Sequence, residues 1–182
     1  MFIASQKRKE NIAEYLLYMW QVEDLIRANN LDIDKIRLNI VDKSGLNEDQ
    51  RKQLTEWYES LIDMMHREGI EKGGHLQLNK NVVIQLVELH HALLKDPQFS
   101  DYTRLFYAAL PAIVDLRSKA GDNPHGEIES CFDALYGMLI MRLGNREITP
   151  ETENAIKCIS RFIALLAHYF HLDEKNELFN KD

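Results

Sequence analysis

The stretch Asn47-Glu-Asp-Gln-Arg-Lys-Gln-Leu-Thr-Glu-Trp-Tyr-Glu-Ser-Leu-Ile-Asp-Met-Met-His-Arg-Glu-Gly69 shows most clearly which fold class the chain adopts. Asn47 and Gln50 have the spacing of a capping box, in which two side chains satisfy the first backbone N–H groups of a helix. A glycine such as Gly69 commonly ends a helix. The apolar residues between them recur every three or four positions, at Leu54, Trp57, Tyr58, Leu61, Met64 and Met65. This period predicts an amphipathic helix over 47–69.

The same period recurs along the rest of the chain, and almost no alternating strand pattern interrupts it. Helices are predicted over 11–29, over 32–41, between Gly74 and Pro97, and over 100–120, where Pro111 should cause a kink. Two more helices are predicted from an N-cap residue followed by proline in the first turn. These starts are Asn123-Pro124, for a helix ending near residue 144, and Thr149-Pro150, for one ending near residue 171. The sequence therefore predicts an all-α fold, an up-and-down helical bundle of about six to seven helices. It forms a single helical domain over 1–182 with a frayed tail over 172–182.

Composition restricts the classes of function. The chain has 182 residues and a net charge of −7, so its average field repels a nucleic-acid backbone or an anionic membrane surface. No apolar run reaches the length of a membrane span. Cys131 and Cys158 both lie in helical apolar patterns, which is typical of reduced core thiols. We therefore expect a cytoplasmic protein with no cofactor, no nucleic-acid partner and no membrane association.

Two polar residues stand on otherwise apolar helix faces. Glu23 shares a face with Ile12, Leu16, Met19 and Ile26, and His90 shares one with Val83, Leu86, Val87 and Leu94. A buried carboxylate must be paired, and Arg27 follows Glu23 by one helical turn. We predict a buried polar cluster of Glu23, Arg27 and His90. Such a cluster is either a closed structural network or, if it has an opening, a site.

Four further residues are weaker candidates. Glu88 and His91 form one Glu-x-x-His step, but a di-metal helical bundle needs two such steps and two further glutamates. Arg161 and His168 resemble in spacing the arginine-to-histidine motif of helical HEPN nuclease domains, although no polar residue follows Arg161. Arg161 and His168 are expected at the surface, because they lie opposite the core face of their helix. No metal site and no catalytic residue is predicted.

A strip of small residues predicts an oligomer. Gly126, Ser130, Ala134, Gly137 and Met141 lie on one side of the helix predicted from residue 123, separate from its core face. Small side chains let a second helix approach closely. The strip therefore predicts a homodimer, and it leaves room for another protein partner.

The segment Asn11-Ile-Ala-Glu-Tyr-Leu-Leu-Tyr-Met-Trp-Gln-Val-Glu-Asp-Leu-Ile-Arg-Ala-Asn-Asn30, together with the chain length, resembles an uncharacterised family of helical proteins from gut Bacteroidetes. The resemblance implies a helical fold and a cytoplasmic bacterial protein, and it transfers no catalytic residue.

Two functions remain open at this stage. The favoured function is that of a non-catalytic helical interaction or structural protein, which acts as a homo-oligomer. No enzymatic activity is expected for it. The alternative is a metal- or phosphoester-handling hydrolase with a site between the helix over 11–29 and the helix before Pro97.

Overall fold

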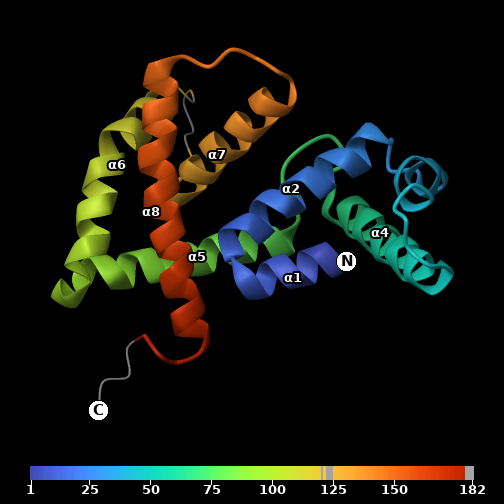
Figure 1. Ribbon diagram of the computed structural model, residues 1–182, viewed down its shortest axis with the longest axis horizontal. Coiled ribbons are helices and arrows are strands. Elements are labelled where there is room, and N and C mark those ends of the chain that lie inside the picture. Colours follow the sequence, from blue (N-terminus) through green and yellow to red (C-terminus); the bar gives the residue numbers. More distant parts are fainter. Residues whose placement is uncertain (120, 122–124, 179–182) are drawn as a thin grey trace. The chain divides into compact units, whose positions relative to one another are not determined.

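The structure is a computed structural model that describes residues 1–119, 121 and 125–178. Every regular element in these residues is helical, which confirms the all-α prediction (Figure 1). There are eight α-helices in them rather than six or seven: α1 Phe2–Glu10, α2 Ile12–Ala28, α3 Ile33–Ile36, α4 Glu48–Glu68, α5 Gln77–Lys95, α6 Ser100–Lys119, α7 Glu127–Leu143 and α8 Pro150–Glu174. A π-helical turn, Arg37–Val41, follows α3, and a 3₁₀ turn, Pro97–Phe99, precedes α6.

The chain divides into two compact units. The first contains Met1–Glu10 and Glu14–Asn81, and the second contains Asn11–Ala13 and Val82–Asp182. The chain changes unit on either side of Asn11–Ala13 and again within α5. The single domain predicted over 1–182 stays a prediction, and each unit is described by itself.

The extra helix is α1. Its sequence has no apolar face of the kind seen in α4, since Ala4 is its one buried residue, and for this reason the apolar period did not reveal it. Asn11 separates α1 from α2. Its side-chain oxygen accepts a hydrogen bond from the backbone N–H of Ala13 at 3.0 Å, so it satisfies an N–H group at the start of α2.

The helix predicted over 47–69 is confirmed with both of its ends. The Asn47 side chain accepts from the backbone N–H of Gln50, and the Gln50 side chain accepts from the backbone N–H of Asn47. Gly69 ends α4 in the left-handed conformation, with φ 67°. That conformation costs a glycine far less than a residue with a Cβ atom.

Two helix starts were predicted at residue pairs that end in proline, and one of them is confirmed. Thr149 caps α8 by accepting from the backbone N–H of Thr152, with Pro150 in the first turn. Asn123 and Pro124 lie outside the described residues. The helix predicted from them, α7, begins later, after Gly126 as N-cap residue.

The frayed tail over 172–182 stays a prediction, and the structure gives the end of the helix before it. α8 continues to Glu174 and ends in a Schellman turn, in which the backbone N–H of Glu177 donates to the carbonyl of Leu172. Asn176 adopts φ 56° in this turn, and Leu178 beyond it is buried.

The second unit shows the packing expected of an up-and-down bundle. α6, α7 and α8 pack on one another, and α6 and α8 lie side by side in opposite directions (Figure 1). Pro111 lies inside α6, and the kink there stays a prediction. The core of this unit is rich in aromatic side chains, namely Tyr102, Phe106, Phe132, Phe162 and Phe170.

The core of the first unit is mainly aliphatic. Its buried side chains come from α1, α2, α3, α4, the π-helical turn and the loop before α5: Ala4, Met19, Val22, Ile26, Ile36, Val41, Tyr58, Leu61, Ile62, Met65, Ile70 and Leu76. In the described part of the chain, no helix combines the length and the apolar character needed to cross a membrane.

Candidate functional site

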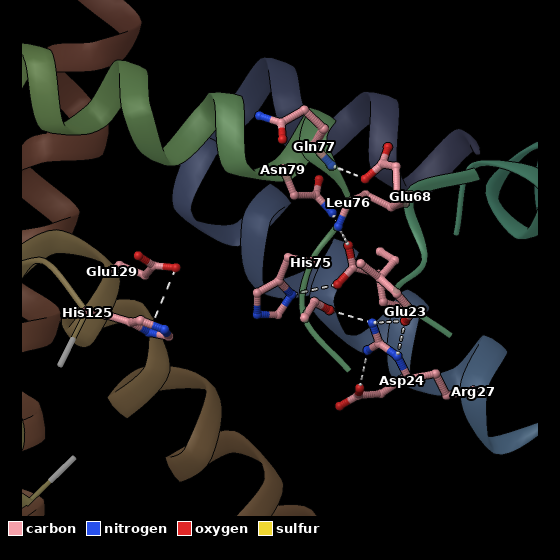
Figure 2. A network of polar contacts seen from close by, with 12 residues as sticks. Glu23, Asp24, Arg27, Glu68, His75, Leu76, Gln77, Asn79, His125 and Glu129 are labelled. Carbon is pink, nitrogen blue, oxygen red and sulfur yellow. Dashed lines mark hydrogen bonds and ion pairs between the residues drawn. The ribbon is translucent and has the colours of Figure 1, made fainter. Parts of the chain in front are cut away.

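Glu23 is the centre of a buried polar network in the first unit. Its side chain is 0% exposed, as predicted, and both carboxylate oxygens have donors from the segment that opens α5 (Figure 2). Oε1 accepts from the backbone N–H of Leu76 at 2.9 Å and from Nδ2 of Asn79 at 2.6 Å. Oε2 lies 2.6 Å from Nδ1 of His75. Three partners therefore offset the loss of water around this carboxylate.

The network satisfies the start of α5. The first N–H groups of a helix have no partner within it, and they carry a partial positive charge that favours anions. Glu23 of α2 accepts from Leu76, and Glu68 at the end of α4 accepts from the backbone N–H of Gln77 at 2.7 Å. Two carboxylates from two other helices thus tie the start of α5 into the first unit.

Arg27 holds the loop between α4 and α5, and it does not pair with Glu23. Its guanidinium donates to the carbonyl oxygens of Ile70 and Gly74 and forms an ion pair with Asp24 at 2.9 Å. The predicted pairing of Glu23 with Arg27 is therefore wrong. Two consecutive glycines, Gly73 and Gly74, give the loop its shape, and the arginine reaches the loop carbonyls instead of the neighbouring carboxylate.

His75 is the member of the network that reaches the surface, with its side chain 23% exposed. The imidazole stacks on the indole of Trp20, with ring centroids 4.0 Å apart and planes 11° from parallel. When Nδ1–H donates to the Glu23 carboxylate, the neutral ring has its lone pair on Nε2. The stacking on Trp20 and the contact with Glu23 hold the ring in one orientation. An imidazole held this way can accept a proton or bind an electrophile through Nε2.

His90 is buried as predicted, 1% exposed, but it does not join Glu23 and Arg27. It belongs to the second unit, where Nδ1 lies 2.6 Å from the Tyr102 hydroxyl and Nε2 lies 3.7 Å from Oε2 of Glu127. Burial and, to a smaller extent, the neighbouring His91 lower the pKa of His90 to about 4. The imidazole is therefore neutral at pH 7 and helps to position the aromatic core around it.

The four weaker candidates lie at the surface. Glu88, His91, Arg161 and His168 are all exposed, which was predicted for Arg161 and His168. The structure does not gather them into one site. Among the described residues, no group of three or more histidine, cysteine, aspartate or glutamate side chains is arranged to hold a metal ion.

A surface ion pair next to the start of α7 gives a prediction that a titration can test. His125 Nδ1 lies 2.7 Å from Oδ2 of Asp133 and 3.8 Å from Oε1 of Glu129. The hydrogen bond to Asp133 raises the pKa of His125 above its usual 6.5. We expect an NMR titration of His125 to have its midpoint above that of a free imidazole, and Asp133→Asn to lower it. An unchanged midpoint in Asp133→Asn would show that the pair does not form in solution.

Sequence reasoning found Glu23 but missed its partners. His75 stands in a Gly-Gly loop outside any helical period, and Asn79 lies in the first turn of α5. The one available signal was the buried carboxylate itself, because it requires donors from somewhere in the chain. Their positions became visible only when α2 and the start of α5 were placed together.

The fold and the network define an all-α protein whose first unit is organised around a buried, fully paired glutamate. The chain belongs to the family described as "Domain of unknown function (DUF4924)", whose family model matches residues 1–177. No curated protein and no solved structure matches the chain.

Proposed function

We propose that the protein is a non-catalytic interaction or structural protein that acts as a homodimer through α7. The observation that carries the proposal is an apolar surface in the second unit. Ile140 is 45% exposed and Leu143 is 67% exposed, and both lie on the C-terminal half of α7. Gly137 is exposed one turn before Ile140. We call Gly137, Ile140 and Leu143 the α7 surface.

Gly137 has no evident role within one copy of the chain. A glycine inside a helix costs about 1 kcal/mol relative to alanine. Its φ is ordinary, and a Cβ atom at this position would meet no other atom within 4 Å. Neither backbone conformation nor internal packing therefore requires glycine here. Close approach of a second helix is a physical reason for a glycine at such a position.

The α7 surface also suits contact with a second copy of itself. In a two-fold symmetric dimer the same residues meet from both sides. Two antiparallel α7 helices place Ile140 of each copy over Gly137 of the other, so each glycine receives a bulky side chain. Ser130 and Ala134 belong to the predicted strip of small residues, but Ser130 is buried and Ala134 half-buried. The proposed contact therefore lies towards the end of α7 and not along its full length.

The polar network supports a structural role. Both oxygens of Glu23 are used by donors of its own unit, and these contacts join α2 to the start of α5. A carboxylate that itself acts as nucleophile, acid or base needs a free oxygen or an opening to the substrate. Cys131 and Cys158 are free thiols, and burial raises the pKa of Cys131 to about 12, which suits a reducing compartment. We accordingly propose a cytoplasmic location. The resemblance of residues 11–30 to a helical family from Bacteroidetes is the reason to propose an origin in that group.

One observation favours the alternative, a hydrolase. Glu23 and Asn79 lie on the two helices between which a hydrolase site was predicted, and His75 beside them exposes part of its ring. In this alternative, His75 is the general base that activates water. Hydrolysis of bis(p-nitrophenyl) phosphate that disappears in His75→Gln would support it. Equal rates of hydrolysis for the unaltered protein and His75→Gln would exclude His75 as the general base and favour the structural role.

The dimer is tested by light scattering on two matched leucine variants. Leu143 is 67% exposed in the second unit and Leu38 is 65% exposed in the first. We expect the unaltered protein to have the mass of two chains. Leu143→Glu should have the mass of one chain, because two carboxylates would be buried at the contact. Leu38→Glu should keep the dimer. A single-chain mass for the unaltered protein at the highest attainable concentration would overturn the proposal.

Gly137→Ala separates dimerisation from folding. In the monomeric Leu143→Glu background, the added methyl group should stabilise the helix by about 0.5–1 kcal/mol. In the unaltered background it should weaken the dimer, since it occupies the space into which Ile140 fits. A dimer of unchanged strength in Gly137→Ala would show that the contact lies elsewhere.

A further inference from the structure

A pocket in the second unit has the composition of a ligand site. It lies between the C-terminal half of α6 and the N-terminal half of α8, which run in opposite directions (Figure 1). Its volume is about 370 Å³. Neither the Glu23 network nor the α7 surface contributes a residue to it. A ligand bound there would therefore not depend on the proposed dimer.

The floor of the pocket is aliphatic. Ile159 is buried there, and Ala112, Leu116, Ala155 and Ile156 are half-buried around it. The two alanines carry only a methyl group each, so they leave space that larger side chains would fill. Among the described residues that line the pocket, none is aromatic. The lining therefore favours a ligand with an aliphatic body.

The size of the pocket limits the length of that body. An apolar cavity of about 150 Å³ holds the six carbon atoms of benzene. The pocket here, with about 370 Å³, is larger, but part of this volume lies at its mouth next to solvent. A chain of about six carbon atoms therefore fits inside with its head group at the mouth.

The polar side chains at the mouth are matched with one another. Nζ of Lys119 donates to Oδ2 of Asp115 at 2.7 Å, and the hydroxyl oxygens of Thr149 and Thr152 lie 3.1 Å apart. Hydrogen bonds from its own backbone N–H and from Thr149 lower the pKa of Glu151, so this carboxylate is charged at pH 7. Among the described residues, Glu151 has no ion-pair partner, because Lys119 is engaged by Asp115.

This arrangement selects a cation over an anion. The C-terminal end of α6 carries a partial negative charge and the N-terminal end of α8 a partial positive one, so the two offset each other where both border the mouth. The described side chains that line the pocket include two carboxylates and one ammonium group. A cation at the mouth is therefore attracted by Glu151, whereas an anion is repelled.

We propose that this pocket binds a small aliphatic amine, with its chain on Ile156 and Ile159 and its ammonium group at Glu151. Such an amine is protonated at pH 7, since its pKa is close to that of a lysine side chain. All the residues of the site belong to the second unit, so the site is complete within one copy of the chain.

Three probes of nearly equal shape test the choice of head group by NMR titration of the full chain. They are hexylamine, hexan-1-ol and hexanoate. We expect saturable binding of hexylamine, binding of hexan-1-ol about threefold weaker, and binding of hexanoate about tenfold weaker, in line with the energy of an exposed ion pair and of the matching repulsion. Equal affinity for all three probes, or no saturable binding of hexylamine, would overturn the proposal.

A lysine side chain of a partner protein carries the same head group on a shorter chain. Nα-acetyl-lysine amide is the probe for this source, and its side chain offers about two carbon atoms fewer than hexylamine. Two buried carbon atoms correspond to about tenfold in affinity, so hexylamine should bind about tenfold more tightly. Tighter binding of the lysine derivative would assign the pocket to a protein partner and contradict the proposal.

Two alanine variants on α6 localise the chain of the ligand. Ala112→Leu fills the pocket, and Ala108→Leu adds the same side chain one turn earlier, at an exposed position that does not line it. Ala112→Leu should abolish binding of both hexylamine and hexan-1-ol, and Ala108→Leu should change neither. Circular dichroism checks that both variants are folded. Unchanged binding in Ala112→Leu would refute the site.

Two glutamate variants localise the ammonium group. Glu151→Gln removes the charge at the mouth, and Glu147→Gln makes the same change of charge at an exposed residue that does not line the pocket. Glu151→Gln should weaken binding of hexylamine about threefold and leave binding of hexan-1-ol unchanged. Glu147→Gln should change neither. Equal losses in the two variants would show a general effect of net charge and rule out the contact with Glu151.

The methyl signals of isoleucine report where the probe binds. In ¹H–¹³C NMR spectra, hexylamine should shift the δ1 methyl signals of Ile156 and Ile159 in the pocket and leave that of Ile140 on the α7 surface in place. Ile156→Val identifies one of the two pocket signals. A shift confined to Ile140 would place the ligand on the α7 surface and contradict the proposal.

Discussion

Glu23→Ala is expected to lower the free energy of unfolding by about 3 kcal/mol or more. The substitution removes three hydrogen-bonding contacts at once and leaves the backbone N–H of Leu76 and the amide of Asn79 without an acceptor. It also leaves a cavity at a position that is 0% exposed. Chemical denaturation followed by circular dichroism measures the change.

Two controls separate the network from a general effect of removing acidic side chains. Glu88→Ala removes an exposed carboxylate from α5 and should change stability by less than about 0.5 kcal/mol. Glu23→Gln keeps the shape and one acceptor oxygen, so its loss should fall between those of the two alanine variants. Equal stability of Glu23→Ala and Glu88→Ala would show that the buried network contributes nothing.

Acid should destabilise the second unit through His90. The pKa of His90 is lowered to about 4 in the folded chain, from an ordinary value of 6.5. The unfolded chain therefore binds a proton more tightly than the folded chain. The neutral imidazole contributes its full share of stability above pH 6.5, and this share is lost as the pH falls from 6.5 to about 4. A difference of this size corresponds to about 3 kcal/mol.

The groups around His90 agree with this direction. The Tyr102 hydroxyl is neutral, and His91 is a neighbouring base, so neither favours a charged imidazole. The Glu127 carboxylate, 3.7 Å away, would favour the charge, but it is 35% exposed and burial of the ring outweighs it. The acid loss should therefore be visible in the pH range 6.5 to 4.

His90→Gln provides the control for this pH dependence. Glutamine does not titrate, so the variant is less stable at pH 7 but should lose less further stability between pH 6.5 and pH 4. Denaturation curves at several pH values measure both slopes. Parallel slopes for the variant and the unaltered protein would show that another group is responsible.

The helical fold was predictable because its signals are local. The capping box of Asn47 and Gln50, the helix end at Gly69 and the Thr149-Pro150 start each depend on a few neighbouring residues, and each is found where it was predicted. α1 was not predicted, because its short segment buries only Ala4 and so shows little apolar period. The ordered end of α8 was not predicted either, because a Schellman turn leaves little trace in a polar sequence.

The burial of single residues was also predictable, because the signal for it is local. The residues that they contact were not predictable. A helical period of 3.6 residues places Glu23 and His90 on the inner faces of their helices, and both are buried. The period contains no information on which residues from other segments meet them. Arg27 was the nearest cation in sequence to Glu23, yet it binds the loop carbonyls of Ile70 and Gly74.

The sequence by itself determined the helices, most of their ends and which side chains turn inward, because backbone hydrogen bonding and the apolar period act within one helix. The tertiary structure decided that Glu23 meets His75 and Asn79, that Glu68 caps α5, and that His90 lies among aromatic rings in a different unit. These contacts join residues from different segments, and for Glu23 the separation is more than fifty positions. Their geometry depends on how whole helices pack, which no local pattern specifies.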